Sequence, residues 1–269
     1  MNKLLALAFV LALGAAALGG MVLSGLPTSA PAAARIGAPT PTAAPTASLV
    51  GIASSPGKAT LAPFDLVRTA IVREGPYLVF IAHVRGRAGA LKPRPTGKLG
   101  GSGVYSYVWP TTLDSSAVGF APKQGILALA VTSHPDFDDT PLYHEAGDGA
   151  PHNAGALWHT HWIVLVPDNA CGAGHLKVKD IPAGTKPRVP ATWPGLPILI
   201  DSPGYVPLIT TSTVQVRVPA RDLVLPATFN YDGVTAGLRV NASVHDPLLC
   251  VTDVFAIASG NLSLPGRVR

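Results

Sequence analysis

The stretch ALWHTHWIVLV, residues 156–166, places His159 and His161 two positions apart in an otherwise apolar run. If this run is a β-strand, both imidazoles lie on one face, with their roots about 6–7 Å apart. Two imidazoles at that spacing can bind one zinc, copper or iron ion. Because a buried imidazole needs a partner, the alternative is a pair of core histidines hydrogen-bonded to carbonyl or carboxylate groups.

The segment just upstream, SHPDFDDTPLYHEAGDGAPHN at residues 133–153, is rich in histidine and carboxylate side chains. It joins two expected strands, so its residues could lie above the end of the strand that carries the histidine pair. We expect the remaining metal ligands to come from His134, Asp136, Asp138, His144 and His152. Asp139, Glu145 and Asp148 are further potential ligands of this segment, and His175 and His245 could contribute from elsewhere.

The donor types favour particular ions. Imidazoles with a few carboxylates favour Cu²⁺ or Zn²⁺, and two imidazoles with one carboxylate would also suit non-haem iron. The acidic segment offers hard oxygen donors for Ca²⁺, although Pro141 stands where an EF-hand loop needs Gly. A turn rich in Asx hydrogen bonds is the alternative interpretation of the same carboxylates.

The tetrapeptide HTHW, residues 159–162, resembles the His-x-His-Trp strand of α-type carbonic anhydrases, which supplies two of three zinc-binding histidines. The resemblance covers four residues, and the downstream strand that should carry the third histidine has no obvious equivalent. Cupins also pair His-x-His on a strand and then place a Glu a few residues later, which WIVLVPDN lacks. Both resemblances imply the chemistry of the spacing, and neither assigns a family.

Composition predicts an all-β fold, an antiparallel sandwich or a small barrel with long Pro- and Gly-rich loops. The 28 glycines, 27 prolines and 13% charged residues favour short strands joined by turns. The segment 190–207 is too rich in proline for a central strand and is expected to be a surface loop. The expected strands are residues 77–84, 104–109, 125–133, 157–166, 206–218, 237–245 and 248–259.

The chain divides into three expected parts. Residues 1–34 have the basic start, apolar core and Ala-rich end of a signal peptide, which could instead remain as a membrane anchor. Residues 35–60 are expected to be a disordered linker and residues 61–269 a single β domain. A periplasmic or secreted location follows, and in such an oxidising compartment Cys171 and Cys250 are expected to form a disulfide; thiolate metal ligation is the alternative.

These observations predict an exported protein that binds a divalent transition metal, with zinc and copper favoured. Hydrolysis would be accessible if the ion kept an open coordination position. No G-x-S-x-G elbow, P-loop or dinucleotide fingerprint is present. The basic run at residues 85–98 lacks interleaved aromatic residues, so we expect no nucleic-acid partner.

Two alternative functions involve no metal. The first is a carbohydrate- or peptide-binding module, with the acidic segment and Trp109, Trp193, Tyr205 and Tyr231 lining a groove for a small molecule or glycan. The second is an envelope structural protein whose histidines are satisfied internally.

Overall fold

A computed structural model describes residues 51–144 and 154–269. The fold is all-β with antiparallel pairing throughout the named strands, and it includes a closed barrel of six strands, which confirms the predicted fold class. The predicted domain limits at residues 34 and 35 lie outside the described residues. No helix in residues 51–144 and 154–269 is long and apolar enough to cross a membrane.

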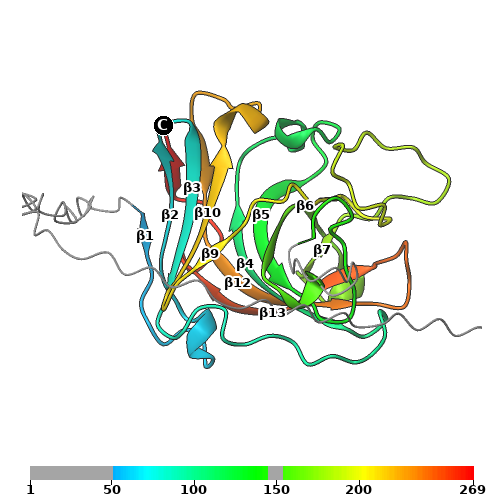
Figure 1. The fold of residues 1–269 in the computed structure, drawn as a ribbon, viewed down its shortest axis with the longest axis horizontal. Coiled ribbons are helices and arrows are strands. Elements are labelled where there is room, and N and C mark those ends of the chain that lie inside the picture. Colours follow the sequence, from blue (N-terminus) through cyan, green and yellow to red (C-terminus); the bar gives the residue numbers. More distant parts are fainter. Residues whose placement is uncertain (1–50, 145–153) are drawn as a thin grey trace, which may run out of the picture. The chain divides into compact units, whose positions relative to one another are not determined.

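The strands labelled β4, β5, β6, β7, β12 and β13 in Figure 1 form the barrel, and β6 carries the histidine pair. It closes because β5 pairs with both β4 and β6. In order around the barrel its strands are β4 (Gly103–Pro110), β5 (Ile126–Ser133), β6 (His159–Pro167), β7 (Leu176–Val178), β13 (Leu249–Ile257) and β12 (Val234–Val240). A short strand, β8 (Ile200–Asp201), adds to β6 on the edge that β7 leaves free.

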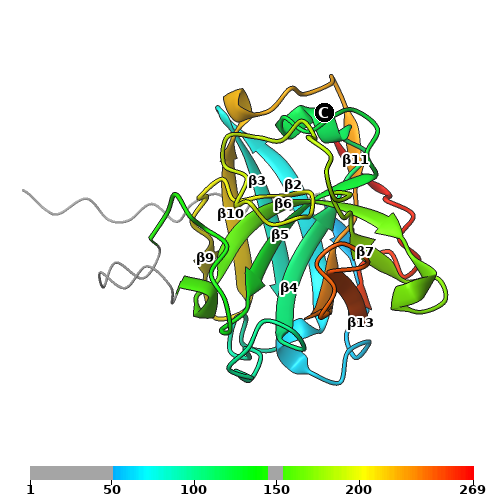
Figure 2. The same ribbon diagram turned by 90° about the vertical axis from the view of Figure 1, so that its right-hand side faces the viewer.

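A second sheet packs beside the barrel strands (Figures 1 and 2). Its order is β1 (Ile52–Ala53), β2 (Leu66–Glu74), β3 (Tyr77–Val84), β10 (Thr213–Pro219) and β9 (Leu208–Ile209). A two-stranded ribbon joins β11 (Phe229–Tyr231) to β14 (Gly266–Val268). The described residues also contain five short 3₁₀ helices: η1 (Ala62–Phe64), η2 (Ser115–Val118), η3 (Ala154–Ala156), η4 (Asn169–Cys171) and η5 (Ala220–Asp222).

The alternation of side chains along β6 separates two apolar cores. Trp162 is fully buried between barrel and sheet, where its ring meets Phe80 edge to face at a centroid distance of 5.9 Å. Ile163 and Leu165 point the other way, into the core inside the barrel. His161 shares the inward face with them, as the period of two requires. The tryptophan therefore holds the strand from outside while the histidine faces the barrel interior.

A disulfide between Cys171 and Cys250 joins η4 to β13, as the sequence predicts. The Cα atoms lie 5.5 Å apart, and the two residues are 79 positions apart in the chain. Closing a loop of this length reduces the entropy of the unfolded chain, which stabilises the fold by about 3–5 kcal/mol. Because both sulfurs are in this bond, neither cysteine is a thiolate that could bind a metal.

The structure differs from the sequence-based expectations in several elements. Ile52–Ala53, expected in the linker, pairs with β2, and the buried carboxylate of Asp65 accepts hydrogen bonds from the backbone of residues 57–59. The strand expected at 206–218 is broken into β9 and β10, and the one expected at 237–245 ends at Val240. The described fold therefore begins upstream of the expected boundary at residue 61.

The segment 190–207 is less exposed than its prolines suggest. Ile198, Leu199 and Ile200 are buried, and β8 lies within this segment. The expectation of a surface loop is therefore wrong for these residues, because the free edge of β6 offers both backbone partners and apolar contacts. The following residues, Asp201 and Ser202, are buried beside β6 as a consequence.

Candidate metal centre

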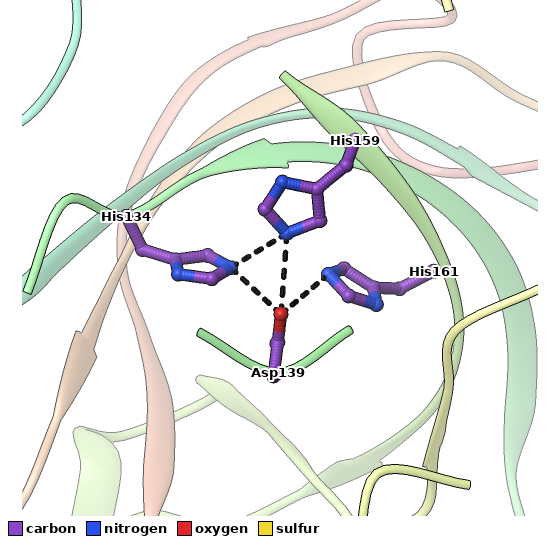
Figure 3. Close-up of side chains that lie close together, drawn as sticks. All are labelled: His134, Asp139, His159 and His161. Carbon is purple, nitrogen blue, oxygen red and sulfur yellow. Dashed lines mark hydrogen bonds and ion pairs between the residues drawn. The ribbon is translucent and has the colours of Figure 1, made fainter. Parts of the chain in front are cut away.

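Four buried side chains meet at one end of the barrel: His134, Asp139, His159 and His161 (Figure 3). His159 and His161 lie on β6, opposite Thr132 and Ala130 of β5. His134 follows directly after the last residue of β5, and Asp139 belongs to the loop that continues from it. The antiparallel pairing of β5 with β6 is thus what brings the third histidine to the pair.

The ligand atoms of the cluster are close enough to share one ion. Oδ1 of Asp139 lies 3.2 Å from Nε2 of His134, 3.2 Å from Nε2 of His159 and 3.3 Å from Nε2 of His161. The Nε2 atoms of His134 and His159 are 2.9 Å apart, and all four ligand atoms lie within 4.8 Å of one another. A tetrahedral zinc ion, with bonds of about 2.0–2.1 Å, keeps its ligand atoms about 3.3 Å apart. The cluster could therefore hold a metal ion.

The opposite nitrogen of each ring has a fixed partner. Nδ1 of His134 lies 2.9 Å from the carbonyl oxygen of Phe137, and Nδ1 of His159 lies 3.0 Å from that of Leu157. A carbonyl oxygen only accepts, so both Nδ1 atoms carry the proton. Nδ1 of His161 lies 3.1 Å from Oγ of Ser202, whose hydroxyl donates to the carbonyl of Asp139 at 2.7 Å. Since that hydroxyl proton is committed, Ser202 accepts from His161.

These hydrogen bonds determine whether each Nε2 atom faces its neighbours with a proton or with a lone pair. With Nδ1 protonated on all three neutral imidazoles, each Nε2 offers a lone pair. Those lone pairs converge with the oxygen of Asp139, and Nε2 of His161 makes no hydrogen bond although it lies 3.3 Å from that oxygen. Four electron-rich atoms buried together repel one another unless a cation lies between them. Outer hydrogen bonds of this kind are typical of histidines that bind a metal.

The pKa shifts of the cluster show the same need for positive charge. Burial acts to raise the pKa of Asp139, but the positive charges of His134 and His161 in their protonated forms, and the hydrogen bonds that protonated rings would donate, outweigh it and hold the pKa well below its usual range. Burial acts to lower the pKa of His134, but the charge and hydrogen bond of Asp139 raise it above its usual value. Burial lowers the pKa of His159, which favours its neutral, ligating form. The buried carboxylate thus stabilises a cation beside it.

The structure brings together three of the predicted ligands and replaces the predicted carboxylates. His134, His159 and His161 meet in the cluster, where Asp139 supplies the carboxylate in place of Asp136 or Asp138. Oδ1 of Asp136 accepts hydrogen bonds from the backbone of Thr96 and Gly97 at 2.6 and 2.7 Å. Oδ1 of Asp138 accepts from the backbone and hydroxyl of Thr140. Asp138 therefore forms the local turn that the Asx-turn interpretation describes, whereas Asp136 ties the loop to residues 96–97.

The other candidate histidines within the described residues lie outside the cluster. His144 is exposed at the edge of the described part of the loop, and His152 lies outside the described residues. Nδ1 of His175 contacts the carbonyl of Val251, and Nδ1 of His245 contacts that of Ile181. Neither of these two joins the group of potential ligands that the described residues form.

The alternative of an aromatic groove is not supported by the positions of its residues. Trp109 and Tyr231 are buried in the core between barrel and sheet, and Nε1 of Trp109 donates to the carbonyl of Ile81. Trp193 is half-buried against the same core, and only Tyr205 borders a polar cavity, with Asp201 and Asp222. These four rings therefore do not line one groove.

Comparison of the chain with protein-family models, curated proteins and solved structures finds no match. The resemblance to carbonic anhydrases and cupins is confined to the His-x-His spacing, because the third imidazole here comes from His134, upstream of the pair. The geometry of the cluster is thus the basis for assigning a function.

Proposed function

We propose that this is an exported metal-binding protein whose barrel holds one divalent transition metal ion through His134, Asp139, His159 and His161. The single observation that carries the proposal is the convergence of four buried ligand atoms whose outer partners fix every imidazole in the ligating tautomer. The alternative of internally satisfied core histidines would need protons between the Nε2 atoms and Asp139. Because the outer acceptors already take the Nδ1 protons, such a proton would make an imidazole doubly protonated and positively charged, whereas a metal ion supplies the positive charge to all three neutral rings at once.

The arrangement favours zinc over copper(II). In a square plane, one of the three nitrogens would lie across the ion from Asp139, about 4 Å away. The three distances from Oδ1 of Asp139 are instead 3.2, 3.2 and 3.3 Å. A carboxylate adjacent to all three imidazoles suits a tetrahedral ion, and zinc accepts that geometry readily.

Export is the second part of the proposal. The signal-like start of the sequence motivates it, and the disulfide between Cys171 and Cys250 is consistent with an oxidising compartment. A buried ion held by four protein ligands is retained rather than exchanged quickly. The role that suits such a centre best is stable metal binding within the envelope or the secreted fraction.

Elemental analysis of protein purified without an affinity tag tests the metal centre. We expect one equivalent of zinc in the wild-type protein after loading with equal zinc and copper(II), and none in the double variant His159→Ala/His161→Ala. The matched control is His175→Ala/His245→Ala, which removes two imidazoles outside the cluster and should keep the full equivalent. Circular dichroism establishes that each variant folds. Unchanged metal content in the first variant would contradict the proposal.

A further inference from the structure

An apolar cavity of about 110 Å³ extends inside the barrel from the His/Asp cluster. We call it the lumen. Its walls are inward side chains of the barrel strands together with Leu196, Ile198 and Ile200 from the segment beside β6. His134, Asp139 and His161 line the same lumen, so the candidate metal centre forms one end of it.

Outside the His/Asp cluster, one polar side chain among the described residues that line the lumen has no hydrogen-bond partner. Oγ1 of Thr132 is buried and makes no hydrogen bond, and the side chain is among those that line the lumen. Thr132 is 7% exposed and pairs directly with His159 where β5 and β6 run side by side. The other lumen hydroxyl, of Ser106, already donates to the carbonyl of Ala236. A buried hydroxyl without a partner costs about 1–3 kcal/mol, which a ligand can recover.

The charge of the filled centre determines which head group suits this end. A divalent ion with three neutral imidazoles and one carboxylate retains a single positive charge. Among the described residues that line the lumen, no ionisable group exists outside the cluster. A monoanion would neutralise that charge in a low-dielectric space, whereas a second cation would be repelled.

The volume of the lumen and its apolar walls determine which part of a ligand, besides an anionic head group, could fit there. For comparison, an apolar cavity of about 150 Å³ accommodates benzene. The smaller lumen suits an aliphatic chain of roughly three to five carbons. Such a chain would contact side chains including Val104, Val108, Ala236 and Leu238.

From these observations we infer that the lumen binds a short-chain aliphatic monocarboxylate, with its tail in the barrel and its head between the bound metal and the hydroxyl of Thr132. The inference rests on the proposed metal centre and adds the ligand class that this centre takes. The net positive charge of the filled centre attracts one carboxylate oxygen toward this end of the lumen. The second oxygen accepts from Thr132.

Isothermal titration of the zinc-loaded protein with acetate, propionate, butyrate and pentanoate tests the inference. Each added methylene should tighten binding about fourfold until the lumen is full. Butanol and butylamine have similar tails but no negative charge, and both should bind at least tenfold more weakly than butyrate. Affinity that is independent of chain length, or equal for butyrate and butylamine, would overturn the inference.

Two variants separate the tail from the head. Ala236→Leu enlarges a side chain that lines the lumen without replacing any ligand, so it should abolish the dependence on chain length and keep one equivalent of zinc. Ala236→Val is a milder version if the larger side chain prevents folding. Thr132→Val should weaken all four acids about tenfold and keep the dependence on chain length. Ala90→Leu, at an exposed position, is the control and should behave as wild type.

The two proposals fail in distinguishable ways. A protein that binds no zinc contradicts the metal centre. A zinc-loaded protein that binds acetate and butyrate equally, with no effect of Ala236→Leu, contradicts the lumen inference alone.

Discussion

Ser202 provides the sharpest test of how the centre is organised, because it is the one outer partner of the three rings that mutation can remove. The partners of His134 and His159 are backbone carbonyls, whereas His161 donates to a side-chain hydroxyl. In Ser202→Ala the ring of His161 loses its acceptor, and the carbonyl of Asp139 loses its donor. Both ligands are then free to rotate away from the shared point.

The magnitude follows from the role of such partners. Removing the hydrogen-bond partner of a metal-bound histidine lowers metal affinity about 10–100-fold, which is about 1.4–2.7 kcal/mol. Because Ser202 holds two of the four ligands and is 1% exposed, we expect the upper half of that range. Competition with a chromophoric zinc chelator measures the affinity directly.

Two control variants make the result specific. Thr160→Val removes a buried hydroxyl between His159 and His161 on β6, where it donates to the carbonyl of Tyr205 on the other face, so zinc affinity should stay within about twofold of wild type. Ser202→Thr retains a hydroxyl and should restore most of the affinity. Equal affinities of Ser202→Ala and wild type would refute the claim that this hydroxyl orients His161 for metal binding.

Three further predictions concern stability. Zinc at a thousandfold excess over its dissociation constant should stabilise the fold by about 4 kcal/mol, seen as a higher Tm in calorimetry, and an unchanged Tm would contradict binding to the folded state. Burial acts to raise the pKa of Asp65, but hydrogen bonds from Arg85 and the backbone lower it below its usual value. The ionised carboxylate therefore stabilises the fold fully above about pH 4, and this stabilisation is lost as the pH falls through the lowered pKa of the folded state. In Asp65→Asn the unfolding free energy should therefore fall less steeply than in the wild type as the pH drops below about 4. Parallel pH curves for the two proteins would contradict a stabilising ion pair between Asp65 and Arg85. Replacing both Cys171 and Cys250 with Ser should reduce the unfolding free energy by about 3–5 kcal/mol in urea titrations, and a loss under 1 kcal/mol would contradict a constraint on the unfolded chain.

The period of two along β6 was sufficient to predict that His159 and His161 share a face. It could not show that His134 joins them, because that depends on the register of β5 against β6. The identity of the carboxylate also depended on the loop. Asp138, two residues before Thr140, has the spacing of an Asx turn, which is a sequence signal that its oxygen serves the backbone.

Elements with mixed polarity were the hardest to predict. The strand β2 (Leu66–Glu74) carries Arg68, Arg73 and Glu74 among its apolar residues, so composition alone did not indicate it. The burial of Ile198–Ile200 depends on the free edge of β6, which no local pattern reveals. The fold class and the long barrel strands were predictable because short apolar runs between turns indicate them directly.

X-ray absorption at the zinc edge of the metal-loaded protein tests the central claim most directly. The account predicts a first shell of four or five nitrogen and oxygen atoms at about 2.0–2.1 Å, with outer-shell scattering from three imidazoles. A six-coordinate, oxygen-rich shell, or scattering from one imidazole or none, would contradict it.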